Sequence, residues 1–310
     1  MKKKNRFLMD LKRYWELHLF MVLGVVWVLV FRYYPMLGLQ LAFKEYSPDL
    51  GMFNSPWVGF EHFRSYFQSI YFGRTMRNTF LISIYFIAAD FPLPILFALM
   101  LNLIRNEKFK KFAQTITYMP HFISTVVLVG MMNQLLSPVT GLYGSLYRIF
   151  TSGIYPEDII GNSSAFIHLY VWSGVWQGLG WNSIIYLAAL SGVSLELHEA
   201  AMIDGASRMK RVWHVDLPAI IPTVCIMLIL RAGTILSVGF EKVYLMQNSM
   251  NIASSEVITT YVYKQGIGKG IRGFSFGSAV GLFNSVVNFI MLVVVNKITK
   301  KLSGDNTSLF

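Results

Sequence analysis

Apolar residues gather along this chain in six long blocks that are separated by polar and basic segments. Each block reaches the roughly 20 residues that a helix needs to cross about 30 Å of hydrocarbon. Because lipid offers the backbone no hydrogen-bond partners, blocks of this length span a membrane as α-helices. The pattern therefore predicts an all-α membrane protein with six transmembrane helices, near Leu17–Leu39, Thr79–Leu103, Ile116–Leu136, Ala165–Leu190, Ala219–Val238 and Phe276–Val295.

The basic residues predict how these six helices are oriented. With the N-terminus inside the cell, 16 of the 27 lysines and arginines fall in the two tails and the internal loops, and 9 in the external loops. Arg32 and Arg231 lie within apolar blocks. Because cytoplasmic loops carry an excess of lysine and arginine, we expect both termini in the cytoplasm. The loop between the fourth and fifth blocks is then cytoplasmic too.

The composition excludes an ordinary soluble protein and a nucleic-acid-binding one. Hydrophobic residues make up 54% of the chain and charged residues 14%, against roughly 25% charged residues in soluble domains. The net charge of +11 comes from short basic clusters beside apolar blocks, so membrane topology explains it. Cys225 is the single cysteine, which excludes a disulfide within the chain. The basic N-terminus precedes a block too long for a cleaved signal peptide, so we expect a retained first span.

The loop between the fourth and fifth blocks carries the most specific motif. It reads Glu199-Ala200-Ala201, continues to Asp204-Gly205, and ends at Leu217-Pro218, where the fifth block opens. Ser194 is a suitable N-cap for a helix from Leu195 to Ile203, and Gly205 can adopt the backbone angles that end one. We therefore expect a short cytoplasmic helix followed by a turn.

This spacing resembles the EAA loop of type I, binding-protein-dependent ABC import permeases, with Val215 where that family has isoleucine. Phe31–Pro35, Asn54–Phe63 and Gly239–Tyr244 resemble more narrowly the LplB-like polysaccharide permeases of the carbohydrate branch. The resemblance implies a subunit that imports sugars or oligosaccharides through the bacterial cytoplasmic membrane. It also implies that the coupling residues Glu199, Ala200, Ala201, Asp204, Gly205, Leu217 and Pro218 contact an ATPase.

The same resemblance implies several partners. They are a second, homologous permease subunit, two ABC ATPase subunits and an extracellular sugar-binding lipoprotein. The chain has no P-loop sequence, so we expect no catalysis and no cofactor here, with ATP and Mg²⁺ bound by the ATPase subunits. Its six histidines show no close metal-ligand pairing.

A saccharide presents hydroxyl groups and apolar ring faces, so its path needs aromatic platforms and amide groups. The candidates are Asn133, Gln134, Trp172, Trp176, Gln177, Trp181, Asn182, Tyr186, Phe240, Glu241 and Tyr244. Alternatives remain open: the tryptophans suit an interfacial belt, the amides suit hydrogen bonds between helices, and the last three suit loop packing. Asp90 and Arg231 are costly inside a membrane and could pair with each other or with the second permease.

The chain divides into an N-terminal part at 1–75, a transmembrane domain at 76–296 that contains the coupling loop at 194–218, and a cytoplasmic tail at 297–310. Three other functions stay open at this point. They are an ion-coupled secondary sugar transporter, an ABC importer of another solute class, and a membrane enzyme acting on saccharides. The secondary transporter would more often show a buried carboxylate relay, and Asp90 alone is little support for one.

Overall fold

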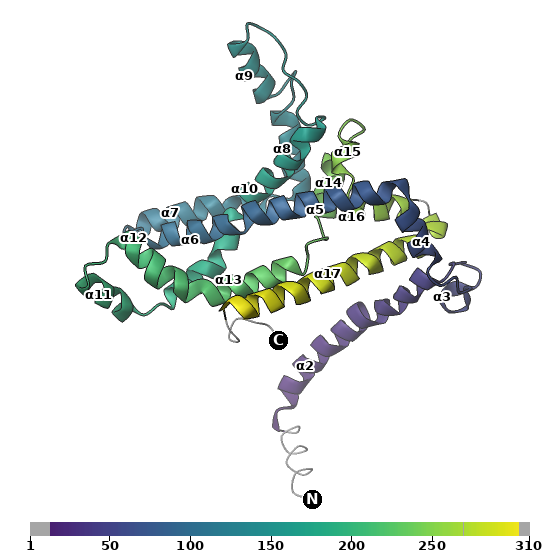
Figure 1. Ribbon diagram of the computed structural model, residues 1–310, viewed down its shortest axis with the longest axis horizontal. Helices are drawn as coiled ribbons and strands as arrows, with labels where there is room; N and C mark the ends of the chain where they lie inside the picture. The colour runs from purple at the N-terminus through teal and green to yellow at the C-terminus, as the bar shows by residue number, and fades with distance from the viewer. Residues whose placement is uncertain (1–12, 269, 304–310) are drawn as a thin grey trace, which may run out of the picture.

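The computed structural model describes residues 13–268 and 270–303, which are almost entirely helical. Within these residues β-pairing is limited to an isolated bridge between Lys44 and Trp57. Long helices lie side by side in a bundle, and α11 sits at one end of it (Figure 1). α8 and α9 project from the bundle, whereas α2 runs apart from it (Figure 1). The all-α fold expected from the apolar blocks is confirmed.

The bundle is built around α10 (Ser163–Ser191), which contacts α5 (Ile70–Asp90), α6 (Pro92–Asn102), α7 (Glu107–Tyr118) and α13 (Leu217–Ala232). α17 (Phe274–Ser303) packs against α13 and α4. The remaining elements are α2 (Trp15–Val28), η1 (Leu29–Tyr33), η2 (Tyr34–Phe43), α3 (Gly51–Asn54), α4 (Glu61–Gln68), η3 (Met119–Phe122), α8 (Thr125–Leu135), α9 (Leu142–Phe150), α11 (Leu195–Ile203), α12 (Arg208–Arg211), η4 (Val212–Asp216), α14 (Phe240–Met246), α15 (Ile252–Ser255), α16 (Ile258–Val262), η5 (Tyr263–Ile267) and η6 (Gly270–Gly273).

Four helices of the described chain are long and apolar enough to cross a membrane, and six spans result if two bent helix pairs each count as one. The second span begins at Ile70, earlier than the sequence predicted, because α5 extends past the apolar block. The fifth runs from Arg208 and its helix ends at Ala232, short of the predicted Val238. The sixth continues beyond the predicted Val295, to Ser303.

The third span is not the single helix that the apolar block Ile116–Leu136 predicted. α7 and η3 end at Phe122, and α8 leaves at an angle of 95°. Pro120 lies in the short 3-10 helix η3, and a proline lacks the N–H that would continue a regular helix. Ser124 then caps α8 by accepting a hydrogen bond from the Val127 N–H at 3.3 Å. The apolar pattern therefore predicted a segment long and apolar enough to span, but not the break within it.

Close backbone contact fixes α7 against α10. A Cβ built on Gly180 would lie 2.3 Å from the Thr117 carbonyl oxygen, far below van der Waals contact. Glycine therefore lets the two helices approach, as small residues do at helix interfaces within membranes. Elsewhere α10 contributes Phe166, Tyr170 and Val171 to an apolar cluster with Val243 and Val257.

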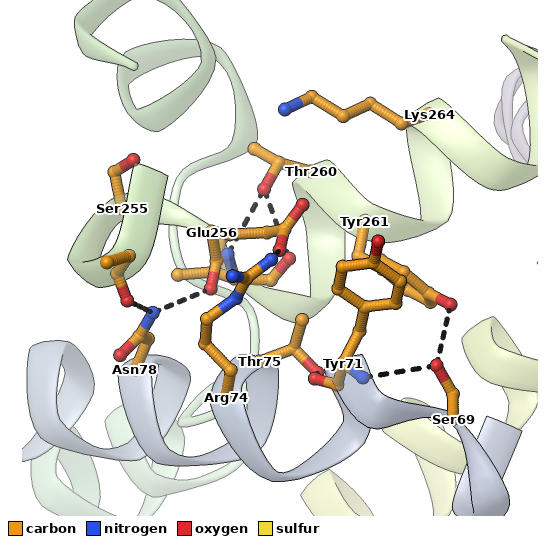
Figure 2. Close-up of polar contacts among 12 residues, drawn as sticks. Ser69, Tyr71, Arg74, Thr75, Asn78, Ser255, Glu256, Thr260, Tyr261 and Lys264 are labelled. Carbon is orange, nitrogen blue, oxygen red and sulfur yellow. Dashed lines mark hydrogen bonds and ion pairs between the residues drawn. The ribbon is translucent and has the colours of Figure 1, made fainter. Parts of the chain in front are cut away.

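At the end of the bundle away from α11, polar contacts tie α5 to the chain that follows the fifth span (Figure 2). Arg74 of α5 forms an ion pair with Glu256, which is buried. The Asn78 amide donates hydrogen bonds to the carbonyl oxygens of Ala253 at 2.9 Å and Glu256 at 3.0 Å. The Ile258 N–H donates to the Thr79 hydroxyl at 3.0 Å. These contacts hold α15 and α16 on the second span.

Candidate functional site

The helix predicted after Ser194 is present with the predicted bounds, Leu195–Ile203. The Ser194 hydroxyl accepts a hydrogen bond from the Glu196 N–H at 3.2 Å, which caps the N-terminus. At the C-terminus, the Ala206 N–H bonds the Ala201 carbonyl at 2.8 Å and the Gly205 N–H bonds the Met202 carbonyl at 3.0 Å. Gly205 has φ +75°. This pair of hydrogen bonds around a left-handed glycine is the Schellman motif.

α11 lies at one end of the bundle (Figure 1), and its apolar side chains are exposed there. Ile203 is 87% exposed and Leu195 69% exposed, and Glu199 and Ala200 are exposed as well. The helix is bent by 72° from α10, so it lies across the end of the bundle instead of extending the span. A short, capped helix with exposed isoleucine and leucine suits docking onto another protein.

A polar contact that the sequence analysis missed ties α11 to the bundle. His198 Nε2 lies 3.3 Å from Asp216 Oδ1, and the Asn102 amide donates to the same oxygen at 3.4 Å. Asp216 is buried. Leu217 packs beside it in an apolar cluster, and Pro218 stands in the first turn of α13. The Asp216 carboxylate therefore links α11 to the ends of the second and fifth spans.

A second polar region lies inside the bundle, where Asp90 and Arg231 pair. Arg231 Nη2 donates to Asp90 Oδ2 at 2.8 Å, and Asp90 is 5% exposed. Of the two arrangements that the sequence left open for these residues, the structure has the pair within this chain. Beside the pair lies a cavity of about 280 Å³ lined by Phe86, Asp90, His121, Tyr170, Gly174, Gln177, Gly178, Asn182, Arg231 and Lys242.

Four of the candidate pathway residues gather at or beside this cavity. The Gln177 amide donates to the Ile123 carbonyl at 2.7 Å, which satisfies a backbone oxygen at the break between η3 and α8. Trp181 stacks on His121 with ring centroids 4.3 Å apart and planes at 2°. Asn182 Nδ2 lies 3.4 Å from both Asp90 carboxylate oxygens. Tyr186 lines a smaller cavity of about 70 Å³ that shares Asp90, Asn182 and Arg231.

The other candidates lie elsewhere. The Trp172 indole donates to the Tyr85 hydroxyl at 2.9 Å and, like Trp176, lies half-exposed on α10. Asn133 and Gln134 are exposed on α8. Phe240 and Tyr244 form an aromatic cluster with Tyr263, with ring centroids 4.9 to 5.4 Å apart, and Glu241 is exposed beside them.

Lys242 is the cavity residue that the sequence analysis passed over, although it lies between two candidates. Its amine donates to the Tyr170 carbonyl at 2.9 Å and lies 4.8 Å from the Tyr170 ring centroid. Burial lowers the pKa of Lys242 to about 8, and the nearby Asp90 carboxylate opposes that shift. The sequence offered one signal for Lys242, namely a basic residue in the segment between the fifth and sixth spans. Among residues 13–268 and 270–303, no group of three His, Cys, Asp or Glu could hold a metal ion.

Comparison with known proteins adds the family. Residues 91–303 match the family described as the binding-protein-dependent transport system inner membrane component. The chain belongs to this family. It is 40% identical to Protein LplB of Bacillus subtilis, with 95% of this chain and 92% of that protein covered. It is also 40% identical to the polygalacturonan/rhamnogalacturonan transport system permease protein YteP of Bacillus subtilis, with 98% and 93% covered.

A solved structure agrees with these relatives. The fold superimposes on a chain of a bacterial ABC transporter involved in the import of the acidic polysaccharide alginate, with a TM-score of 0.86 and 35% identity over 96% of this chain and 99% of that one. The fold also superimposes on a chain of a bacterial alginate ABC transporter in complex with an alginate pentasaccharide-bound periplasmic protein, with a TM-score of 0.85 and 36% identity over 96% of this chain and 98% of that one. The resemblance to type I ABC permeases is confirmed, and the chain is a multi-pass membrane component of a transport system.

Proposed function

We propose that this chain is the membrane-spanning subunit of an ATP-driven importer of saccharides. The observation that carries the proposal is α11, a helix capped at both ends that presents exposed apolar residues beyond the last turn of the fourth span. Relatives whose names specify polygalacturonan, rhamnogalacturonan or alginate support a saccharide as the solute. The aromatic and amide groups around the 280 Å³ cavity suit such a solute.

In this proposal, α11 docks in a groove of an ABC ATPase on the cytoplasmic side. Glu199 meets polar or basic groups of that subunit, and Ala200 and Ala201 allow close approach because their side chains are small. Asp204 and Gly205 turn the chain back toward the bundle. Leu217 and Pro218 begin α13 of the fifth span, which moves during transport. Both termini are cytoplasmic, and ATP with Mg²⁺ is bound by the ATPase subunits alone.

Transport then follows from two alternative arrangements of the assembly. ATP binding closes the ATPase pair and draws the α11 helices of this chain and of a second permease subunit together. The bundle moves from inward-open to outward-open, receives the saccharide from an external binding lipoprotein, and releases it inside after hydrolysis. ATP biases an equilibrium between two states that the bundle already possesses.

Uptake into proteoliposomes that contain the purified assembly tests this proposal. Labelled saccharide should enter only when the binding protein is outside and ATP is inside, and should not enter with a non-hydrolysable ATP analogue. A protonophore should leave uptake unchanged. Uptake that continues without ATP and stops with the protonophore would establish an ion-coupled secondary transporter instead.

A further inference from the structure

The charges around the 280 Å³ cavity do not balance. Among the described side chains that line it, Asp90 is the one carboxylate, whereas Arg231 and Lys242 each carry a positive charge. The remaining polar side chains are the neutral amides of Gln177 and Asn182, the phenol of Tyr170, and His121, which cannot be negative. The cavity therefore has an excess of one positive charge near the middle of the apolar span Ile70–Asn102.

Both cations keep donors available. A guanidinium has five N–H donors, and Asp90 accepts from Nη2 of Arg231 while 38% of that side chain is exposed. An ammonium has three, and the Tyr170 carbonyl accepts one from Lys242. Phe86 supports the Arg231 guanidinium, which lies 4.9 Å from its ring centroid. The guanidinium geometry suits recognition of a planar carboxylate.

Gly174 leaves room beside the lysine. A Cβ at this position would lie 3.2 Å from Lys242 Nζ and 2.6 Å from a ring carbon of Phe86. Any larger residue would displace Phe86 or cover the amine. His121 also lines the cavity, and Trp181 stacks behind it with the two ring planes at 2°, so the imidazole offers a fixed flat face to a sugar ring. Cationic donors and an aromatic platform thus surround the same space.

An uncompensated charge inside a membrane protein is costly and marks a solute pathway. We propose that this cavity selects acidic saccharides, with Lys242 and the free donors of Arg231 binding a uronate carboxylate while His121, held by the stacked Trp181, contacts the sugar ring. This inference rests on the proposed saccharide import and assigns Lys242 and Arg231 as its specificity-determining residues. Asp90 orients Arg231 and limits the excess to one charge, so that the anion is released again.

Saturation-transfer NMR titrations on the complete transporter in nanodiscs test the inference without the binding protein. The two probes are a galacturonate trisaccharide and the same trisaccharide with its carboxylates reduced to primary alcohols. Because a hydrogen bond to a charged group corresponds to roughly tenfold to hundredfold in affinity, the acidic probe should bind at least about tenfold more tightly. Equal binding of the two probes, or binding of neither, overturns the inference.

Substitutions of Lys242 and Asp90 test whether the charges of the cavity cause the preference for the acidic trisaccharide. Lys242→Met removes the excess charge and should bring the two affinities close together, whereas Lys242→Arg keeps the charge and should keep the preference. Asp90→Asn adds to the excess and should increase the preference, and it retains an oxygen that Arg231 can bond. A preference unchanged in both Lys242→Met and Asp90→Asn overturns the assignment, and the second variant decides alone if the first does not fold.

Uptake measurements separate this inference from the function on which it rests. ATP-driven import of the neutral trisaccharide at the same rate as the acidic one would leave the saccharide importer intact and contradict acidic selection. If the wild-type assembly shows no ATP-driven uptake of either saccharide, the proposed importer function itself is contradicted.

Discussion

Replacing Gly205 with proline should uncouple transport while leaving the protein inserted in the membrane. Gly205 has φ +75°, and proline fixes φ near −65°, so the backbone would have to rotate by about 140°. Proline also lacks the N–H that bonds the Met202 carbonyl at 3.0 Å. Neither hydrogen bond of the Schellman motif can then form in its present geometry, and α11 loses its fixed exit.

The free-energy cost of a milder substitution at Gly205 follows from the surroundings of this residue. A Cβ at this position would meet nothing within 4 Å, so the cost of Gly205→Ala is that of the left-handed backbone alone. That cost is about 1–2 kcal/mol, which shifts the population of the turn by a factor of roughly 5 to 30. Gly205→Asn should cost less, because asparagine adopts this conformation more readily than other residues.

The assay is the stimulation of ATPase activity by saccharide-loaded binding protein in the reconstituted assembly. We expect stimulation close to wild type for Gly205→Asn, reduced for Gly205→Ala, and absent for Gly205→Pro, all at wild-type levels of inserted protein. Gly153→Pro is the matched control, since Gly153 also has positive φ and open space around it but lies far from α11 along the chain. Full coupling in Gly205→Pro, or equal uncoupling in Gly153→Pro, would refute the role assigned to this turn.

Three further predictions concern the packing and the caps. Asp90→Ala leaves the Arg231 charge without its partner and should destabilise the protein by about 3–5 kcal/mol, seen as a lower thermal midpoint in detergent; the double variant with Arg231→Met should recover much of the loss. Gly180→Ala inserts a methyl group 2.3 Å from a carbonyl oxygen and should cost about 1–3 kcal/mol or prevent folding, whereas Gly192→Ala, with its nearest atom at 3.4 Å, should be neutral within about 0.5 kcal/mol in the same melt. Ser194→Ala removes the N-cap of α11 and should weaken that helix by about 1 kcal/mol, measured as faster amide hydrogen exchange confined to α11.

The helix α11 could be predicted from sequence in detail because local chemistry determines its bounds. Ser194 and Gly205 act on their own neighbours, and the structure has the helix between the residues that they indicated. The break in the third span could not be predicted from the apolar pattern, because the apolar block Ile116–Leu136 runs across it. Pro120 and Ser124 were the local signals for it, and neither alone distinguishes a kink from a break.

The cavity was predictable only in part because it is assembled from segments far apart along the chain. Gln177, Trp181 and Asn182 were found because they stand on one apolar helix, where polar and bulky aromatic residues are conspicuous. The partners of Gln177 and Trp181, the Ile123 carbonyl and His121, come from η3 and the break that follows it, which the sequence analysis did not foresee. The contact between His198 and Asp216 was missed for the same reason, since it joins residues from two elements.

Site-specific cross-linking from the tip of α11 tests the central claim most directly. With Cys225 replaced by serine, Ile203→Cys carries a single thiol at a position that is 87% exposed. A photoactivatable maleimide at this position should join the chain to an ATPase subunit in inside-out membranes, and an impermeant maleimide should not reach it in intact cells. Labelling of this cysteine from outside the cell, or the absence of any ATPase cross-link in an active assembly, would contradict the account.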